Sequence, residues 1–193
     1  MRIFLAGATG VIGRRIIPLL READHEVAGM TRSASNVAAL RALGAEPVVC
    51  DVFDSERVRD AVTGFAPDLV IHQLTDLPDD AARIREAGGA NARIRREGTR
   101  SLLDAADAAG VERFLAQSVA WTIPGDGGAA VAEMEQMVLA AGGVVLRYGQ
   151  FYGPGTYHPT DPPPPPRVHV DTAAARTVAS LTTPSGVITI TEE

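Results

Sequence analysis

Short apolar runs alternate with amphipathic stretches along most of the chain. The apolar runs have the length of buried strands, and the stretches between most of them repeat apolar residues three and four positions apart, which is helical spacing. The predicted strands are Arg2–Ala6, Glu26–Met30, Glu46–Cys50, Asp68–His72, Arg113–Gln117, Val144–Arg147, Val168–Val170 and Gly186–Thr191. The first predicted helix begins after Gly13 and is expected to kink at Pro18. The other predicted helices are Asn36–Leu43, Ser55–Val62, Asp79–Ala109 with a break at Gly88 and Gly89, Ala129–Ala141 and Thr172–Leu181.

This alternation indicates an α/β fold. Strands that are apolar on both faces and separated by helices are typical of a doubly wound parallel sheet, flanked by helices and joined by right-handed crossovers. A helical bundle and an antiparallel sandwich fit neither the alternation nor the lengths of the runs.

The regular pattern ends near Gly155. His158–Pro166 contains five consecutive prolines, which favour a stiff polyproline II connector; a ligand for a proline-binding domain is the alternative. We therefore predict a main domain over residues 1–156, a connector over 157–167, and a strand–helix–strand over 168–193 that completes the same domain.

Composition excludes several classes of protein. Of 193 residues, 46% are hydrophobic and 22% charged, which argues against a mostly disordered chain. A net charge of −6 gives no basic footprint for nucleic acid, and no apolar run is long enough for a membrane span. Cys50 is the sole cysteine and the histidines are scattered, so we expect no metal. We expect a soluble cytoplasmic protein that acts on a small molecule.

The chain contains no lysine, since all 18 basic residues are arginine. Codon bias explains this count. Its chemical consequence is the same whatever the cause: no Schiff base, no Walker-type phosphate lysine and no Tyr-x-x-x-Lys catalytic pair can form.

A glycine-rich stretch follows the first predicted strand and precedes the first predicted helix. In this context Gly7 permits a tight turn, Gly10 lets the backbone approach a pyrophosphate, and Gly13 lets the helix lie close to the strand. The helix N-terminus then faces the phosphates. A turn without a ligand is the alternative. The predicted cofactor-binding residues here are Gly7, Thr9, Gly10, Val11, Ile12 and Gly13.

The spacing of this loop is Gly-x-x-Gly-x-x-Gly, and the chain here resembles the short-chain dehydrogenase/reductase superfamily, in its extended and atypical NAD-dependent epimerase/dehydratase-like branch. Further collinear matches are Asp51-Val52, Leu69–Leu74, Glu97-Gly98-Thr99, Val145–Gly155 and His169-Val170-Asp171. The resemblance implies a Rossmann domain, with Asp51 and Val52 at the adenine ring and Gln73 and Leu74 near a cofactor ribose. It implies a cofactor-side residue at Asn91 or Arg95.

The residues after the second strand bear on the choice of dinucleotide. NAD-selective sites usually place a carboxylate there, whereas this chain has Met30-Thr31-Arg32-Ser33. Arg32 is suited to a 2′-phosphate, with Arg14 as a second candidate. We predict NADP(H) in preference to NAD(H); the alternative for both arginines is a solvated surface position.

The family's acid/base pair is missing. Its tyrosine and lysine fall on Gly127 and Val131, so ordinary alcohol–ketone redox chemistry is not expected. The candidate catalytic residues that remain are Ser118, at the end of the fifth strand, and Tyr148, just after the sixth. The C-terminal substrate lobe that the family implies is reduced here, which predicts a shallow, open site.

Three functions follow from these observations. The first is an atypical NAD(P)H-dependent oxidoreductase that acts on an activated substrate. The second is a non-redox cyclase, dehydratase or isomerase on the same scaffold, and the third is an inactive NADP(H)-sensing or regulatory protein. The resemblance also implies a homodimer through two helices, with apolar candidates at Leu102, Leu103, Met134, Met137 and Val138.

Overall fold

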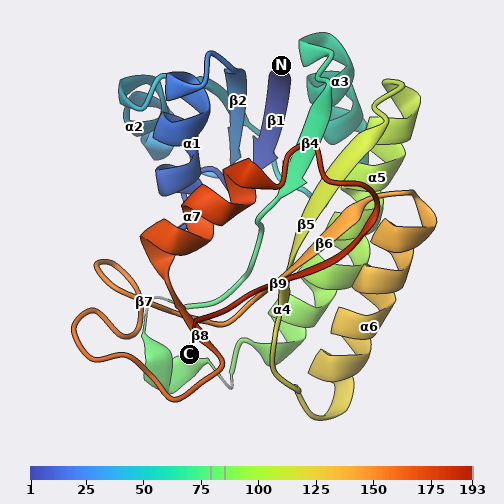
Figure 1. Cartoon of the computed structure of the whole chain (residues 1–193). Coiled ribbons are helices and arrows are strands. Elements are labelled where there is room, and N and C mark those ends of the chain that lie inside the picture. The colour runs from blue at the N-terminus through green and yellow to red at the C-terminus, as the bar shows by residue number, and fades with distance from the viewer. Residues whose placement is uncertain (79, 85, 193) are drawn as a thin grey trace.

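The protein is described by a computed structural model over residues 1–78, 80–84 and 86–192. Seven parallel strands form one sheet in the order β3-β2-β1-β4-β5-β6-β9 (Figure 1). Their bounds are β1 Arg2–Ala6, β2 Glu26–Thr31, β3 Glu46–Val49, β4 Leu69–His72, β5 Arg113–Val119, β6 Val144–Tyr148 and β9 Gly186–Ile190. Two short parallel strands, β7 Gln150–Tyr152 and β8 Arg167–His169, pair beside the sheet.

Helices cover both faces of this sheet (Figure 1). They are α1 Gly13–Glu22, α2 Val37–Ala42, α3 Ser55–Phe65, α4 Gly88–Arg93, α5 Thr99–Ala108, α6 Gly125–Ala140 and α7 Val170–Ala179. One hydrophobic cluster lies between the sheet and α1, α2 and α7, and a second lies between the sheet and α3, α5 and α6. The predicted doubly wound α/β fold is therefore confirmed.

The long helix predicted over Asp79–Ala109 is the main difference. Residues 79 and 85 lie outside the described residues, and Ala81–Arg83 form a single 3-10 turn. The continuous helix begins at Gly88, so the two glycines mark its start and not a break within it. A π-helical turn, Ile94–Gly98, joins α4 to α5. Pro18 lies inside a continuous α1.

The strand order reverses between β1 and β4, because the chain crosses from one side of the sheet to the other. In open parallel sheets this switch point opens a crevice at the carboxyl ends of the strands, and ligands bind there. The glycine-rich loop follows β1 at this point. Residues after the connector add β9 to the edge of the same sheet, and α7 packs against α1 on one of its faces.

Three of the five apolar residues proposed for a homodimer face inward. Leu102, Met134 and Val138 are buried within the chain itself, in contact with the sheet or with neighbouring helices. Leu103 and Met137 are partly exposed. The resemblance implied an apolar dimer face on these helices, but three of the five residues it named cover the protein's own core.

Candidate functional site

The glycine loop is shaped by close contacts that only glycine permits. Gly7 has a φ of +88°, and a Cβ on it would lie 2.6 Å from the backbone carbon of Gln73. A Cβ on Gly13 would lie 2.3 Å from the Gly7 carbonyl oxygen. These two glycines let the loop fold against the end of β4 and let α1 begin directly above it.

Gly10 differs from these two because it is exposed. A Cβ on it would approach nothing closer than the Gly7 oxygen at 3.3 Å, so its outer face is open. Within the part of the chain that the structure describes, no backbone carbonyl accepts from the N–H groups of Val11 and Ile12. Free N–H groups at the start of a ten-residue helix, beside an open glycine, fit a dinucleotide pyrophosphate.

Arg15 holds this loop to the C-terminal segment. Its guanidinium donates to the Val11 carbonyl at 2.7 Å, to the Pro154 carbonyl at 2.5 Å and to Asp171 at 2.6 Å. Its neighbour Arg14 is exposed, and sequence reasoning singled out only Arg14 of the two. Helical phase is the signal that separates them, because Arg15 lies nearer the face of α1 that meets α7.

Arg32 follows β2 at the rim of a pocket of about 370 Å³, which Asp76, Leu77, Pro78, Ala87 and Ala90 complete. Its guanidinium lies 3.1 Å from the Asp76 carboxylate. The Asp76 backbone N–H in turn donates to the Asn91 side-chain oxygen at 3.2 Å. An acidic side chain thus stands beside Arg32, although it comes from the β4 end and not from the β2 end where such residues usually lie.

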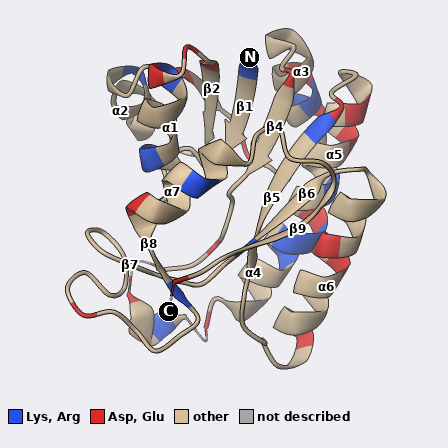
Figure 2. Cartoon of the chain, in the orientation of Figure 1, with Lys and Arg blue, Asp and Glu red and all other residues tan. Residues whose placement is uncertain are grey.

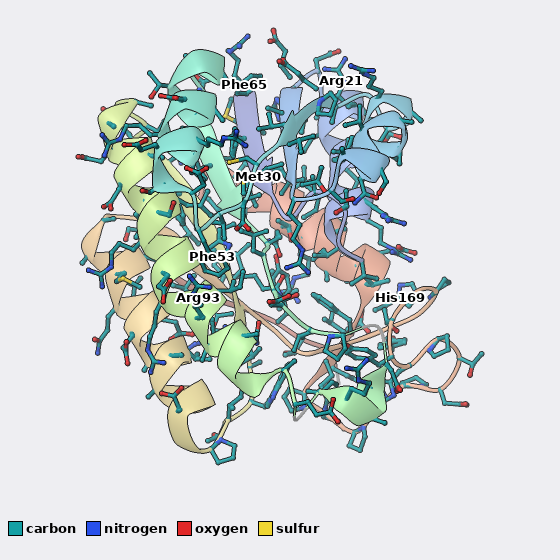
Figure 3. The ribbon with its side chains drawn as sticks, turned by 180° about the vertical axis from the view of Figure 1, so that it is seen from behind. Arg21, Met30, Phe53, Phe65, Arg93 and His169 are labelled. Carbon is teal, nitrogen blue, oxygen red and sulfur yellow. The ribbon has the colours of Figure 1, made fainter. Side chains whose placement is uncertain are left out.

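Asp51 and Val52 follow β3, on the same side of the crevice. The Asp51 carboxylate accepts from the Phe53 backbone N–H at 3.0 Å, and Val52 is buried. The Arg93 guanidinium lies 3.8 Å above the Phe53 ring, a cation–π contact that joins this loop to α4 (Figure 3). The loop is therefore held in place from both sides.

The end of β4 is tied to α7 by a chain of buried hydrogen bonds. Thr177 donates to the Ala173 carbonyl at 2.7 Å, so its oxygen accepts from the Tyr148 hydroxyl at 2.6 Å. The Tyr148 oxygen accepts from the Gln73 amide at 3.1 Å. Burial raises the pKa of Tyr148 to about 12. The Tyr148 proton is thus directed to Thr177, away from the crevice, and Leu74 follows Gln73 at the edge of the site.

Ser118 is also buried, at the end of β5. Its hydroxyl donates to Glu135 of α6 at 2.5 Å. The Arg147 guanidinium holds the same carboxylate with two bonds, from Nε at 2.9 Å and from Nη2 at 2.5 Å. Burial alone would raise the pKa of Glu135, but the hydrogen bonds from Arg147 and Ser118 outweigh burial, and that pKa lies below its ordinary value. Glu135 is therefore ionised at neutral pH.

Arg95 also interacts electrostatically with Glu135. It belongs to the π-helical turn, a kind of helical irregularity that often occurs at functional sites, and it is only 6% exposed. Its Nη1 lies 3.9 Å from the Met134 sulfur. Burial lowers the pKa of Arg95, and the charge of Glu135 partly offsets that shift. Sequence reasoning named Arg95 but missed Glu135 and Arg147, because only the fold brings β6 beside α6.

The helix start that the missing tyrosine and lysine would occupy lies against the β5–α6 loop. A Cβ on Gly128 would lie 2.0 Å from the Ile123 carbonyl oxygen, so this position also requires glycine. Val131 lines a pocket of about 440 Å³ in this place. The helix start to which the resemblance assigns the acid/base pair, with Gly127 and Val131, thus lies beside this pocket. In the described residues no group of three metal-ligating side chains occurs.

The sheet, the switch point and the glycine loop together define a Rossmann-type dinucleotide-binding protein. Comparison with known proteins agrees: the chain belongs to the NAD(P)H-binding family, whose model matches residues 7–141. The expected resemblance to the epimerase/dehydratase-like branch of the short-chain dehydrogenase/reductase superfamily is confirmed. Among the described residues, no helix is long and apolar enough to cross a membrane.

Two relatives extend this result. The chain is 41% identical over 189 residues to the 3-diazoavenalumate denitrifying reductase of a Streptomyces species, a match that covers 83% of this chain and 60% of that protein. It is 32% identical over 116 residues to the 3-beta-hydroxysteroid dehydrogenase of Mycolicibacterium neoaurum, covering 59% of this chain and 31% of that one. The chain thus spans less than two thirds of these relatives.

Solved structures show the same fold. The UDP-glucose 4-epimerase of Thermotoga maritima superposes with a TM-score of 0.80 at 19% identity, covering 99% of this chain and 77% of the epimerase. The Thermus thermophilus UDP-glucose 4-epimerase in complex with NAD gives 0.79 at 21% identity, covering 99% and 78%. A C-terminal lobe shorter than that of the epimerases fits this coverage.

Proposed function

We propose that this chain is an atypical NAD(P)H-dependent reductase that acts on an electron-poor small molecule. The observation that carries the proposal is the pairing of an intact phosphate loop with an α6 start that has Gly127 and Val131 where the tyrosine and lysine fall. The loop provides for the dinucleotide, whereas the assisting acid is missing.

The phosphate loop would hold the pyrophosphate through the open face of Gly10 and the free N–H groups of Val11 and Ile12. Asp51 and Val52 would border the adenine, and Gln73 and Leu74 the adjoining ribose. Arg32 supports a preference for NADP(H), because its guanidinium is suited to a 2′-phosphate once it leaves Asp76. When bound, the reduced nicotinamide supplies a hydride, and an acceptor that needs no proton, such as one that loses N₂, suits a site without a general acid.

The catalytic roles of Ser118 and Tyr148 remain predictions. Each hydroxyl is buried and donates to a protein partner, so each would act by positioning that partner and not by direct proton transfer. The Streptomyces relative favours the reductase reading, since its name describes the reduction of a diazo compound. That name supports an activated acceptor and does not define the substrate of this chain.

Calorimetric titration with NADPH, NADP⁺, NADH and NAD⁺ tests the cofactor part of the proposal, beside an Arg32→Ala variant. We expect NADPH to bind most tightly and the variant to lose that preference. Loss of absorbance at 340 nm then tests turnover with an enone, a quinone, an iminium ion and an arenediazonium ion. Failure to bind any of the four nucleotides would overturn the proposal, and binding without any turnover would favour the sensor alternative.

A further inference from the structure

The pocket beside α6 is lined by apolar and aromatic side chains on its sides and by charged side chains elsewhere. Trp121 and Ile123 of the β5–α6 loop and Val131 of α6 give it apolar and aromatic walls, with Thr189 of β9 at the side. Arg147 and Glu135 form the charged part of the lining. A volume of about 440 Å³ is in the range of small-molecule sites and accommodates a single-ring compound.

The charges around this pocket do not cancel. The Glu135 carboxylate is held by the Arg147 guanidinium of β6, and the charge of the buried Arg95 in the π-helical turn also acts on it, lowering the pKa of Glu135. The three groups together carry a net charge of +1. Figure 2 shows basic residues near α4 beside acidic residues of α6. The outer group, in which Arg96 pairs with Asp126 and Glu133, carries a net charge of −1, but none of its three members lines the pocket. The positive charge at the pocket itself comes from the inner cluster.

Arg147 retains capacity for a second anion. A guanidinium has five N–H groups, and Glu135 uses Nε and Nη2 on one edge. The edge formed by Nη1 and the remaining Nη2 hydrogen has the spacing of a carboxylate. Both side chains line the pocket, but the Arg147 side chain is 43% exposed and the Glu135 side chain only 9%, so the cation is far more accessible to a ligand than the anion.

We infer that this pocket binds the substrate of the proposed reductase, and that the substrate is a ring-bearing carboxylate. Its carboxylate would pair with the free edge of Arg147, and its ring would lie against Trp121, Ile123 and Val131. That this ligand is the substrate rests on the proposed reductase function. Binding of the ring-bearing carboxylate to the pocket requires no cofactor and can be measured without one.

Trp121 is the one tryptophan of the chain and lines the pocket, so its fluorescence reports occupancy directly. The probes are 3-phenylpropanoate and 3-phenylpropanamide, which have the same ring and chain but differ in charge. We expect the carboxylate to bind about tenfold more tightly than the amide, as one charge-assisted contact allows. Calorimetry with the same pair checks the affinities without relying on fluorescence.

Two variants should move this preference in opposite directions. Arg147→Gln removes the contact and should abolish the preference for carboxylate, whereas Glu135→Gln removes the competing anion and should increase it severalfold. A merely structural ion pair would weaken both probes equally in both variants. Arg41→Gln, which removes an exposed arginine of α2, is the matched control and should behave as the wild type.

Arg147→Gln leaves Glu135 without its main partner and can fail to fold. The double variant Glu135→Gln/Arg147→Gln keeps two amides in place of the ion pair and should also lose the preference. Equal affinity for the two probes in the wild type, or an unchanged preference in the double variant, would overturn the inference. If the protein binds the nucleotides but shows no preference for the carboxylate probe, the proposed function stands and this inference fails. If it prefers the carboxylate but binds no nucleotide, the pocket stands as a carboxylate site and the proposed function fails.

Discussion

The Arg32 guanidinium lies 3.1 Å from the Asp76 carboxylate, across the rim of the pocket that follows β2 and β4. The two residues are 44 positions apart, and each follows a strand that neighbours β1. In the proposed NADP(H) site, Asp76 would compete with the 2′-phosphate for the same cation, and its own charge would repel that phosphate.

We therefore expect Asp76→Asn to bind NADPH roughly threefold more tightly, since an exposed ion pair of this kind contributes up to about 1 kcal/mol. Affinity for NADH, which lacks the 2′-phosphate, should change little. Calorimetric titration of both nucleotides measures the ratio, with Asp161→Asn in the connector as the control. An equal change for NADPH and NADH would show that Asp76 does not act on the 2′-position.

The open face of Gly10 predicts a loss of binding without a loss of folding. A methyl group there meets only the Gly7 oxygen at 3.3 Å within the protein, but it projects where the pyrophosphate of the proposed cofactor would approach. Gly10→Ala should keep its melting temperature within a few degrees and bind NADPH at least roughly tenfold more weakly.

Gly64→Ala is the control for this substitution. Gly64 is exposed within α3, and no atom lies within 4 Å of the position that an added methyl group would take. Alanine there should stabilise the protein by about 0.5–1 kcal/mol and leave binding unchanged. Unaltered NADPH affinity in Gly10→Ala would contradict the assignment of the loop.

The buried His72 should make the free energy of unfolding fall in acid. Its Nδ1 accepts from the Leu74 N–H at 3.2 Å, and Nε2 lies 3.0 Å from the Thr99 hydroxyl. Burial, and then the charge of Arg95, lower the pKa of His72 to about 3. Between pH 6.5 and 3 the unfolded chain binds a proton that the folded chain does not, so stability falls as the pH falls, by about 1.4 kcal/mol per unit at most.

His72→Asn keeps an acceptor for Leu74 and removes the titrating group. Urea unfolding at pH 7 and pH 5 should show that the wild type loses about 2 kcal/mol more than the variant over this interval. His158→Asn in the loop after β7 is the control and should retain the wild-type slope. Parallel slopes for the wild type and His72→Asn would exclude this origin of acid sensitivity.

Replacing Tyr148 should affect the stability of the protein without affecting its turnover. Tyr148→Phe removes the hydroxyl between Gln73 and Thr177 and should cost about 1–3 kcal/mol of unfolding free energy, because the Gln73 amide loses a buried partner. Since the Tyr148 proton is directed to Thr177, kcat should stay within about threefold of the wild type. A fall in kcat of a hundredfold or more with unchanged stability would make Tyr148 the proton donor instead.

The strand pattern was readable from the sequence because burial on both faces of a parallel sheet leaves nearly continuous apolar runs. β1 is found over the predicted residues, and most other strands differ by one or two positions at an end. The start of α4 was not readable in this way. The segment before Gly88 has helix-compatible composition, but Ala81–Arg83 form only a single 3-10 turn, and α4 begins at Gly88.

The glycine loop, Arg32 and the residues at the start of α6 could all be placed along the chain from the sequence, because a short loop and the residues that flank a strand or begin a helix are local features; their functional roles stay predictions. The environment of the candidate catalytic residues could not. The Tyr148 hydroxyl donates to Thr177, 29 residues away, and the Ser118 hydroxyl donates to Glu135, 17 residues away. Sequence periodicity reports which side of an element is buried, whereas a hydrogen-bond partner depends on which elements become neighbours. The tertiary structure alone therefore decided that Ser118 and Tyr148 face protein, and that Arg147 faces the pocket.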